Sequence, residues 1–232
     1  MSSLETLAIR DKVLGVVDER GYLYPMLLNS NPELPIWTQC INKATFTEVA
    51  NLRKVVCNKN LRIIGKHTFV NGGSLEEIEF NDGLLEICSE VFANTKIEYL
   101  SLPSSLIDLD DYTFSRMYSL KHIKFSSGQT RVLPACFFML SSLEKVELAK
   151  ECVEIHNFAF SSSGIRTINL PKGLLTIGKE AFSNCKNLTD IVIPNSCERI
   201  GTGAFADCNK LKEIKFPDRF TKDDIRIIMR QE

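Results

Sequence analysis

One phrase recurs along most of the chain and narrows the folds open to it. An aliphatic residue is followed five positions later by a phenylalanine, and the phrase returns every 22 to 24 residues. The aliphatic members are Ile41, Ile64, Ile87, Leu109, Leu133, Ile155, Ile177 and Ile200. The aromatic members are Phe46, Phe69, Phe92, Phe114, Phe138, Phe160, Phe182 and Phe205. Such a period is typical of a solenoid, in which each coil buries its apolar edge against the next.

A strand pattern, L-x-x-I-x-L, follows each phenylalanine. Its members are Leu52, Val55, Cys57; Leu75, Ile78, Phe80; Ile97, Leu100, Leu102; Leu120, Ile123, Phe125; Leu143, Val146, Leu148; Ile165, Ile168, Leu170; Leu188, Ile191, Ile193; and Leu211, Ile214, Phe216. The last two members lie two positions apart and face one side of a strand, so the residue between them points outward. We expect eight parallel strands spanning about 38 Å, at about 4.8 Å each, with the phenylalanine rings stacked inside as a spine.

Two segments carry a more specific motif. Ile168 to Cys185 reads I-N-L-P-K-G-L-L-T-I-G-K-E-A-F-S-N-C, and Ile191 to Cys208 nearly repeats it. The motif resembles the BspA-like leucine-rich repeat, L-x-x-I-x-L-P-x-x-L-x-x-I-G-x-x-A-F-x-x-C-x-x. The resemblance covers residues 41–216, although the repeats at 109–125 and 133–148 lack the strand-end proline and the alanine before phenylalanine. It implies an α/β solenoid, a right-handed leucine-rich repeat array of about eight coils.

The ends of an array need caps, because a terminal coil would expose its apolar face. We expect the array to span residues 41–220 and a capping helix to occupy 221–232. Thr221 is suited to be its N-cap, and the two aspartates at 223 and 224 favour the positive end of the helix dipole. Ile225, Ile228 and Met229 would then lie on one face.

Residues 1–40 allow two interpretations. Leu4, Leu7, Ile9, Val13 and Val16 have the internal spacing of the apolar residues between 52 and 64, which indicates a degenerate first repeat. The same segment could instead form a hairpin that turns at residues 19–21, serving as an N-terminal cap. Both alternatives remain open from the sequence.

Charge and hydropathy exclude several kinds of partner. The chain carries 28 basic and 29 acidic side chains, for a net charge of −1, so we expect no nucleic-acid partner. It has no apolar run of the roughly 18 residues that membrane insertion needs. Charges within the first 12 residues argue against a secretory signal, so we expect a cytoplasmic protein as the sequence stands. The resemblance implies instead a cell-surface or secreted protein.

The cysteines are best interpreted as core residues. Cys57 and Cys197 occupy positions that other repeats fill with aliphatic or aromatic residues. Cys185 and Cys208 each lie three residues after a spine phenylalanine in adjacent coils, where in-register side chains point parallel to each other rather than toward a disulfide partner. No C-x-x-C pair is present, so the sequence predicts no structural metal site.

No catalytic constellation is predicted. Cys88 and His156 each directly follow a leading isoleucine, but they lie three coils apart, about 14 Å. The pairs His67–Cys88 and Cys136–His156 lie in adjacent coils but at different places around the coil. No phosphate-binding loop, dinucleotide fingerprint or nucleophile elbow occurs. We therefore expect no enzyme activity and no cofactor.

The outward side of the strands is the best candidate for a binding face. The basic segment 53–56 lies beside the acidic segment 76–79, and basic 121–124 beside acidic 144–147. One interpretation is a solvated ladder of ion pairs that stabilises the sheet. The other is a docking face for a protein partner, with candidate residues Tyr99, His122, Lys124, Glu77, Glu79 and Glu147. The resemblance implies surface adhesion or host-protein binding, and the alternative is an intracellular scaffold with a cytosolic partner.

Overall fold

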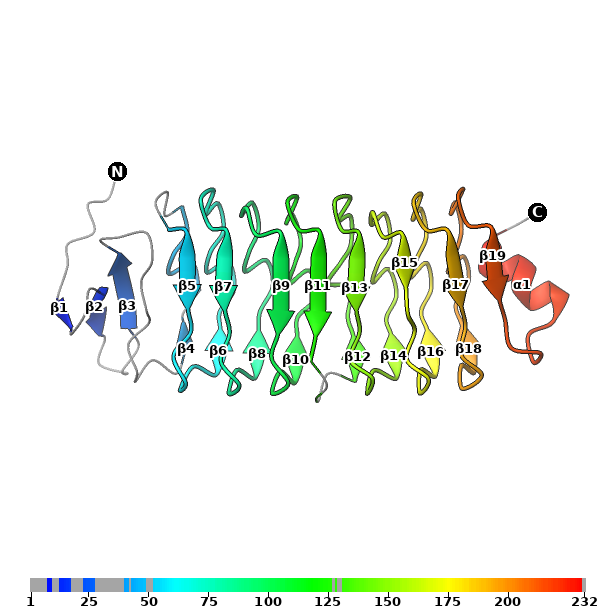
Figure 1. Ribbon diagram of the computed structural model, residues 1–232, viewed down its shortest axis with the longest axis horizontal. Helices are drawn as coiled ribbons and strands as arrows, with labels where there is room; N and C mark the ends of the chain where they lie inside the picture. Colours follow the sequence, from blue (N-terminus) through cyan, green and yellow to red (C-terminus); the bar gives the residue numbers. More distant parts are fainter. Residues whose placement is uncertain are drawn as a thin grey trace.

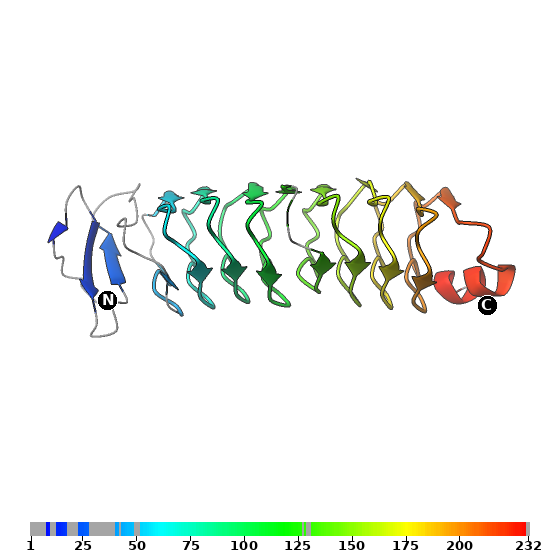
Figure 2. The same ribbon diagram turned by 90° about the horizontal axis from the view of Figure 1, so that it is seen from below.

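The computed structural model describes three short N-terminal strands and most of the chain from residue 40 onward. The described residues are 8–9, 13–17, 23–27, 40–41, 43–48, 52–126, 128 and 131–230. From residue 40 the chain winds as coils that lie side by side along one axis (Figure 1), and the view at 90° shows two rows of strands on different sides of the same coils (Figure 2). The predicted solenoid is confirmed.

Each coil contributes one strand to each row. The long-strand row holds β5 (Lys54–Val56), β7 (Glu77–Glu79), β9 (Tyr99–Leu102), β11 (His122–Phe125), β13 (Lys145–Glu147), β15 (Thr167–Ile168), β17 (Asp190–Val192) and β19 (Glu213–Lys215). The short-strand row holds β4 (Cys40–Ile41), β6 (Ile63–Ile64), β8 (Glu86–Ile87), β10 (Asp108–Leu109), β12 (Val132–Leu133), β14 (Glu154–Ile155), β16 (Thr176–Ile177) and β18 (Arg199–Ile200). The predicted strand is therefore present in every coil, and the leading aliphatic residue lies in a second, shorter strand that the sequence pattern did not predict.

All strand pairs between successive coils are parallel and in register. The long-strand row forms a six-stranded sheet from β9 to β19 and a separate pair, β5–β7. The short-strand row divides into β4–β6–β8–β10 and β12–β14–β16–β18. The division between β10 and β12 falls at the longest spacing between leading aliphatic residues, 24 positions from Leu109 to Leu133. An extra residue there separates the two short strands while the long strands stay paired.

A column of stacked phenylalanine rings fills the core. The rings stack in two runs, from Phe46 to Phe92 and from Phe114 to Phe205. Within each run, neighbouring ring centroids are 5.0 to 5.7 Å apart and the rings are nearly parallel. Every spine ring is at most 1% exposed. Because each aromatic ring removes a large apolar area from water, the column is a principal source of the solenoid's stability.

One predicted member of the spine is wrong. Phe137 stacks on Phe114 at 5.3 Å, whereas Phe138 is only partly buried and lies outside the column. The backbone fixes this register, since the N–H of Phe137 donates to the carbonyl of Ala159 as the N–H of Phe160 donates to that of Ala181. The segment after Leu133 is one residue shorter than in the other coils, so four positions, not five, separate Leu133 from its spine residue.

In most coils two residues adopt left-handed backbone, one on either side of the spine phenylalanine, and the coil of Phe137 has only the second. The residues two positions before it include Ala44, His67, Glu90, Tyr112, Phe158, Glu180 and Gly203. The residues two positions after it are Glu48, Asn71, Asn94, Arg116, Met139, Ser162, Asn184 and Asp207. These paired reversals produce the tight turns of each coil, and they point the side chains before the phenylalanine toward solvent. We call this side of the coils the turn face.

The predicted capping helix is confirmed as α1 (Lys222–Met229). Thr221 is its N-cap and forms a reciprocal capping box with Asp224. Ile228 is buried against the last coil, where the carbonyls of Ile227 and Ile228 accept the N–H groups of Gly203 and Phe205. In earlier coils the next coil provides these acceptors, so the C-terminal end of α1 substitutes for a further coil. α1 is the single helix among the described residues.

At the other end, β1 (Ala8–Ile9), β2 (Val13–Val17) and β3 (Leu23–Leu27) form an antiparallel sheet. β2 and β3 pair from Val13 with Leu27 to Val17 with Leu23. This is the pairing that the hairpin interpretation requires, whereas a first coil of the array would pair parallel to the second. The expected turn at residues 19–21 lies outside the described residues.

Candidate functional site

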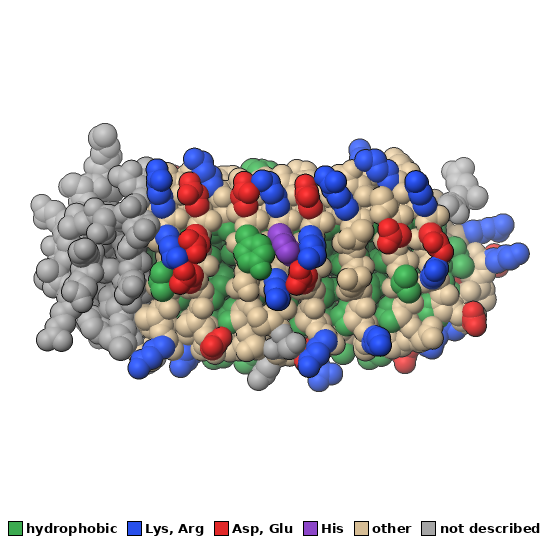
Figure 3. Space-filling model, in the orientation of Figure 1, with side chains coloured by type: hydrophobic (Ala, Val, Ile, Leu, Met, Phe, Trp, Pro, Cys, Tyr) green, Lys and Arg blue, Asp and Glu red, His purple; other side chains and the backbone are tan. Residues whose placement is uncertain are grey.

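The outward side chains of the long-strand row form a mixed-charge surface, which we call the outer face (Figure 3). Ion pairs join adjacent strands across it. Lys54 lies 3.0 Å from Glu77 and also contacts Glu79, and Lys121 lies 2.8 Å from Glu98. The predicted cross-strand ladder is therefore present. Because these groups are largely exposed, each pair contributes little to stability.

A compact group near the middle of the outer face departs from this simple ladder. The ring of Tyr99 meets that of His122 edge to face, with centroids 5.0 Å apart. His122 Nε2 lies 3.2 Å from a Glu147 carboxylate oxygen, which also accepts from Lys145 at 2.6 Å. The hydrogen bond from Lys145 and the contact with His122 hold the pKa of Glu147 below its usual value. We call Tyr99, His122, Lys145 and Glu147 the Tyr99 cluster.

The surface is hollowed beside this cluster. Tyr99 is 51% exposed and borders a depression of about 530 Å³. The other lining residues are Glu76, Lys96, Glu98 and Ser119. An exposed aromatic ring above a hollow with charged walls offers a partner both apolar area and orienting charge. Both features are common at the centres of protein interfaces.

The structure brings some of the predicted site residues together and separates others. Tyr99, His122 and Glu147 are in contact, as described above. Lys124 is in register with Glu147 on the neighbouring strand, but its ammonium group makes no ion pair with any described residue. Glu77 and Glu79 are bound to Lys54 on β5, so they form a separate cluster.

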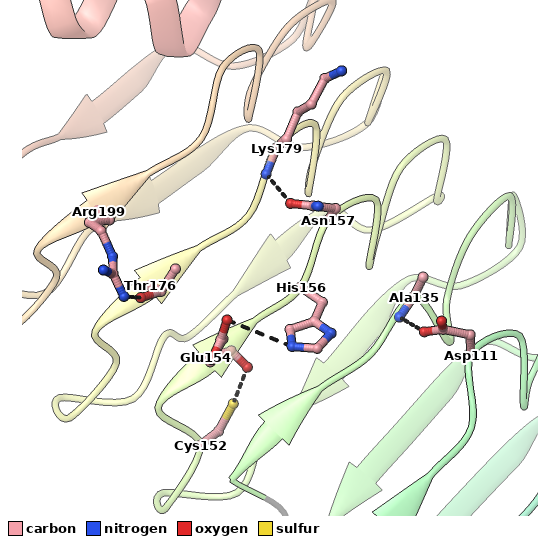
Figure 4. A network of polar contacts seen from close by, with 9 residues as sticks. All are labelled: Asp111, Ala135, Cys152, Glu154, His156, Asn157, Thr176, Lys179 and Arg199. Atoms are coloured by element: carbon pink, nitrogen blue, oxygen red, sulfur yellow. Dashed lines mark hydrogen bonds and ion pairs between the residues drawn. The ribbon is translucent and has the colours of Figure 1, made fainter.

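The short-strand side of the coils carries polar contacts rather than a catalytic pair (Figure 4). His156 Nε2 lies 3.7 Å from Glu154, and the Cys152 thiol donates to the backbone carbonyl of Glu154 at 3.5 Å. Other contacts join one coil to the next, as when Asn157 accepts the N–H of Lys179 at 2.7 Å. The first two contacts lie within one coil and the third joins two coils, and none of them brings a histidine to a cysteine thiol.

The thiols belong to the core. The seven cysteines from Cys57 to Cys208 are not joined in disulfides. Burial raises the pKa of Cys57 to about 12 and that of Cys152 to about 11. Cys185 and Cys208 each donate to a spine phenylalanine's carbonyl at 3.1 Å, those of Phe160 and Phe182. Protonated thiols of this kind are poor nucleophiles and poor metal ligands.

Within residues 40–41, 43–48, 52–126, 128 and 131–230, no cluster of three or more histidine, cysteine or acidic side chains could hold a metal ion. Across the part of the chain that the structure describes, no helix has the length and apolar character to cross a membrane.

Sequence reasoning missed an elongated groove on the turn face, which we call the turn groove. Its volume is about 700 Å³. Tyr112, Phe138 and Phe158 line one end, and Glu180, Asp207 and Arg230 line the other. A signal was available in the sequence, since Tyr112 and Phe158 precede their spine phenylalanines by two positions, where side chains point outward. Phe138 gives no such signal, because the repeat spacing predicts it as a spine residue.

Comparison with known proteins agrees with the geometry. The sequence profile described as BspA type leucine rich repeat region matches residues 39–139 and 130–226, in six copies. No curated protein matches the chain by sequence.

Several solved structures are similar to this chain. The leucine-rich repeat protein of T. pallidum, TpLRR, is 22% identical with a TM-score of 0.54, over 80% of this chain and 79% of that one. A leucine-rich repeat protein from Bacteroides ovatus is 19% identical with a TM-score of 0.44, over 89% and 70%. The pneumococcal vaccine antigen PcpA is 23% identical with a TM-score of 0.44, over 86% and 64%. At these identities, the similarity to TpLRR concerns the fold alone.

Proposed function

Because the chain belongs to the BspA type leucine rich repeat family, we propose that it is a non-enzymatic protein-binding module whose outer face contacts a partner protein. Solenoids of this kind bind through an extended surface rather than through a deep enclosed site. The role proposed for this face is surface adhesion or host-protein binding, as the family resemblance implies.

The Tyr99 cluster is the observation that carries the proposal. Tyr99 is the one aromatic side chain among the outward residues of the described long strands, and it is half exposed beside a hollow. Tyrosine is common at the energetic centres of protein interfaces because it buries a large area with little loss of conformational entropy. His122 supports one edge of the ring, so Tyr99 is oriented before a partner arrives. The unpaired ammonium group of Lys124 adds a charge that a partner's carboxylate can meet.

The test is quantitative affinity capture from extracts of the native source. The protein is compared with the triple variant Tyr99→Ala/His122→Ala/Lys124→Ala. A matched control, Leu175→Ala/His156→Ala/Arg199→Ala, removes three exposed side chains from the short-strand side. We expect a set of proteins captured by the wild type and by the control, and recovered at least tenfold less by the outer-face variant, about 1.4 kcal/mol.

Thermal unfolding by circular dichroism verifies that both variants are folded. If the outer-face variant captures the same proteins in the same amounts, the outer face does not bind them. Equal loss in the control variant would also contradict the proposal.

One observation favours the second candidate, an intracellular scaffold that binds a cytosolic protein. The seven cysteines from Cys57 to Cys208 carry thiols, which a reducing compartment preserves and an oxidising one does not. Localisation of the native protein, with mass spectrometry of its thiols, separates the two candidates. Fully reduced protein confined to the cytosol would contradict adhesion, and protein exposed at the cell surface would contradict the scaffold.

A further inference from the structure

The aromatic end of the turn groove lacks an explanation in the fold. Tyr112 and Phe158 adopt left-handed backbone, with φ of 64° and 61°. Bulky side chains are unfavourable in this conformation. The same position in other coils holds alanine, glycine, histidine or glutamate, and only these two coils place a large apolar ring there. Their rings do not compensate through burial in the core, because they remain 48% and 36% exposed. Since left-handed backbone recurs in most coils, it is the exposed aromatic surface at this position that points to a binding role.

The third ring completes an aromatic surface at this end. Phe138 lies outside the spine, and its ring meets that of Tyr112 edge to face with centroids 6.4 Å apart. Phe158, from the next coil, lines the same groove. Faces of aromatic rings carry negative electrostatic potential and attract cations, most strongly where water is partly excluded. The aromatic end therefore favours a positively charged guest.

The charged residues that line the other end of the groove, Glu180, Asp207 and Arg230, sum to one negative charge. Arg230, at the C-cap of α1, binds Glu180 at 2.7 Å and neutralises it. Asp207 also lines the groove, but its carboxylate has no hydrogen bond or ion pair with any described residue. The charged end therefore also favours a cation.

The shape of the groove selects an extended guest. Its lining residues run from the coil of Tyr112 to that of Asp207, four coil steps, or about 19 Å at the strand spacing. An extended peptide of about six residues has this length. Its basic side chains, on alternate positions, would reach the same side of the groove.

We propose that the turn groove binds an extended, basic peptide segment of a partner protein, with one cationic side chain on Tyr112, Phe138 and Phe158 and another beside Asp207. This site is separate from the outer face and does not depend on the function proposed there. A neutral sugar would also stack on the rings, but it would leave the Asp207 charge without a role.

Three dye-labelled decapeptides test the proposal by fluorescence anisotropy with the full-length protein. They alternate serine with arginine, with glutamine or with glutamate. We expect saturable binding of the arginine peptide that weakens with added salt, and at least tenfold weaker binding of the other two. Phe158→Ser and Asp207→Asn should each weaken binding of the arginine peptide about threefold to tenfold.

Matched controls use groups of the same kind outside the groove. Tyr118→Ser removes another exposed aromatic ring, Asp223→Asn another exposed carboxylate, and Tyr99→Ser the centre of the outer face. Each should leave arginine-peptide binding unchanged. The proposal is overturned if the glutamine peptide binds equally well, if the controls weaken binding as much as the groove variants, or if no binding saturates at about 1 mM protein. The groove would instead be a carbohydrate site if the protein bound an oligosaccharide but not the arginine peptide, and if Phe158→Ser abolished the oligosaccharide binding.

Discussion

Left-handed residues flank the spine phenylalanines, two in every coil except that of Phe137, and the side chain at each of these positions decides how strained the backbone is. Asn71, Asn94 and Asn184 suit the position after the ring, because asparagine tolerates left-handed backbone better than most residues. Asn94 also donates to the Asn71 side chain at 2.7 Å, which links two coils. Met139 has no such preference and is held there by neighbouring coils, as its N–H donates to the carbonyl of Ser161 at 2.8 Å.

Two adjacent phenylalanines provide a matched test of the spine register. Phe137→Ala should lower the free energy of unfolding by about 3–5 kcal/mol, because it leaves a cavity in a fully buried stack. Phe138→Ala should lower it by about 1 kcal/mol or less, because that ring is only partly buried. Urea unfolding followed by circular dichroism measures both. Phe160→Ala is the reference and should resemble Phe137→Ala.

If Phe138→Ala lowered the free energy of unfolding more than Phe137→Ala, Phe138 would be the spine residue, five positions after Leu133. Phe138 would then not line the turn groove.

At the scale of the element, α1 ends the array by supplying the backbone acceptors that a further coil would provide. The sequence of α1 explains why a helix forms here and which side of it packs on the array. Thr221 and Asp224 satisfy each other's backbone N–H groups at 3.1 and 2.8 Å, and Ile228 faces the last coil. The two-residue strands also match their sequences. In each strand one side chain is apolar and faces the core, and its neighbour faces outward, so burial alternates along the strand.

The capping box makes α1 sensitive to acid. Hydrogen bonds from the Thr221 side chain and backbone lower the pKa of Asp224. Because the folded pKa lies below the unfolded one, the stabilisation is fully present above the usual aspartate pKa. It is lost as pH falls through the folded value. Amide hydrogen exchange in α1 should therefore accelerate, relative to the central coils, as the solution is acidified below about pH 4.

Asp224→Asn should remove this pH dependence, and Thr221→Ala should destabilise α1 by about 1 kcal/mol at neutral pH. Asp223→Asn is the control, since Asp223 lies outside the capping box and pairs only with Arg226 at 3.6 Å. If the relative exchange in α1 does not change on acidification, the capping box does not stabilise the helix.

At the scale of the whole molecule, regular repetition is what makes the fold predictable from the sequence. The aliphatic and phenylalanine columns, the inward and outward strand positions and the capping helix all follow from period and burial. The same reasoning failed at Phe138, where a one-residue shortening changed the register while leaving another phenylalanine in the expected place. Tyr99 and His122 were foreseeable as neighbours because their strands are in register. The turn groove was not, because it depends on where the left-handed turns point their side chains.

The central claim is that this stack of coils presents its outer face, centred on Tyr99, to a protein partner. A photo-crosslinking residue placed at position 99 tests it most directly, compared with the same residue at position 175. Leu175 directly precedes the short strand β16. It is 42% exposed and Tyr99 is 51% exposed, so the two positions are similarly accessible. After irradiation in the native source, we predict covalent partner adducts from position 99 and none from position 175. Adducts from position 175 alone, or from neither position, would contradict the claim.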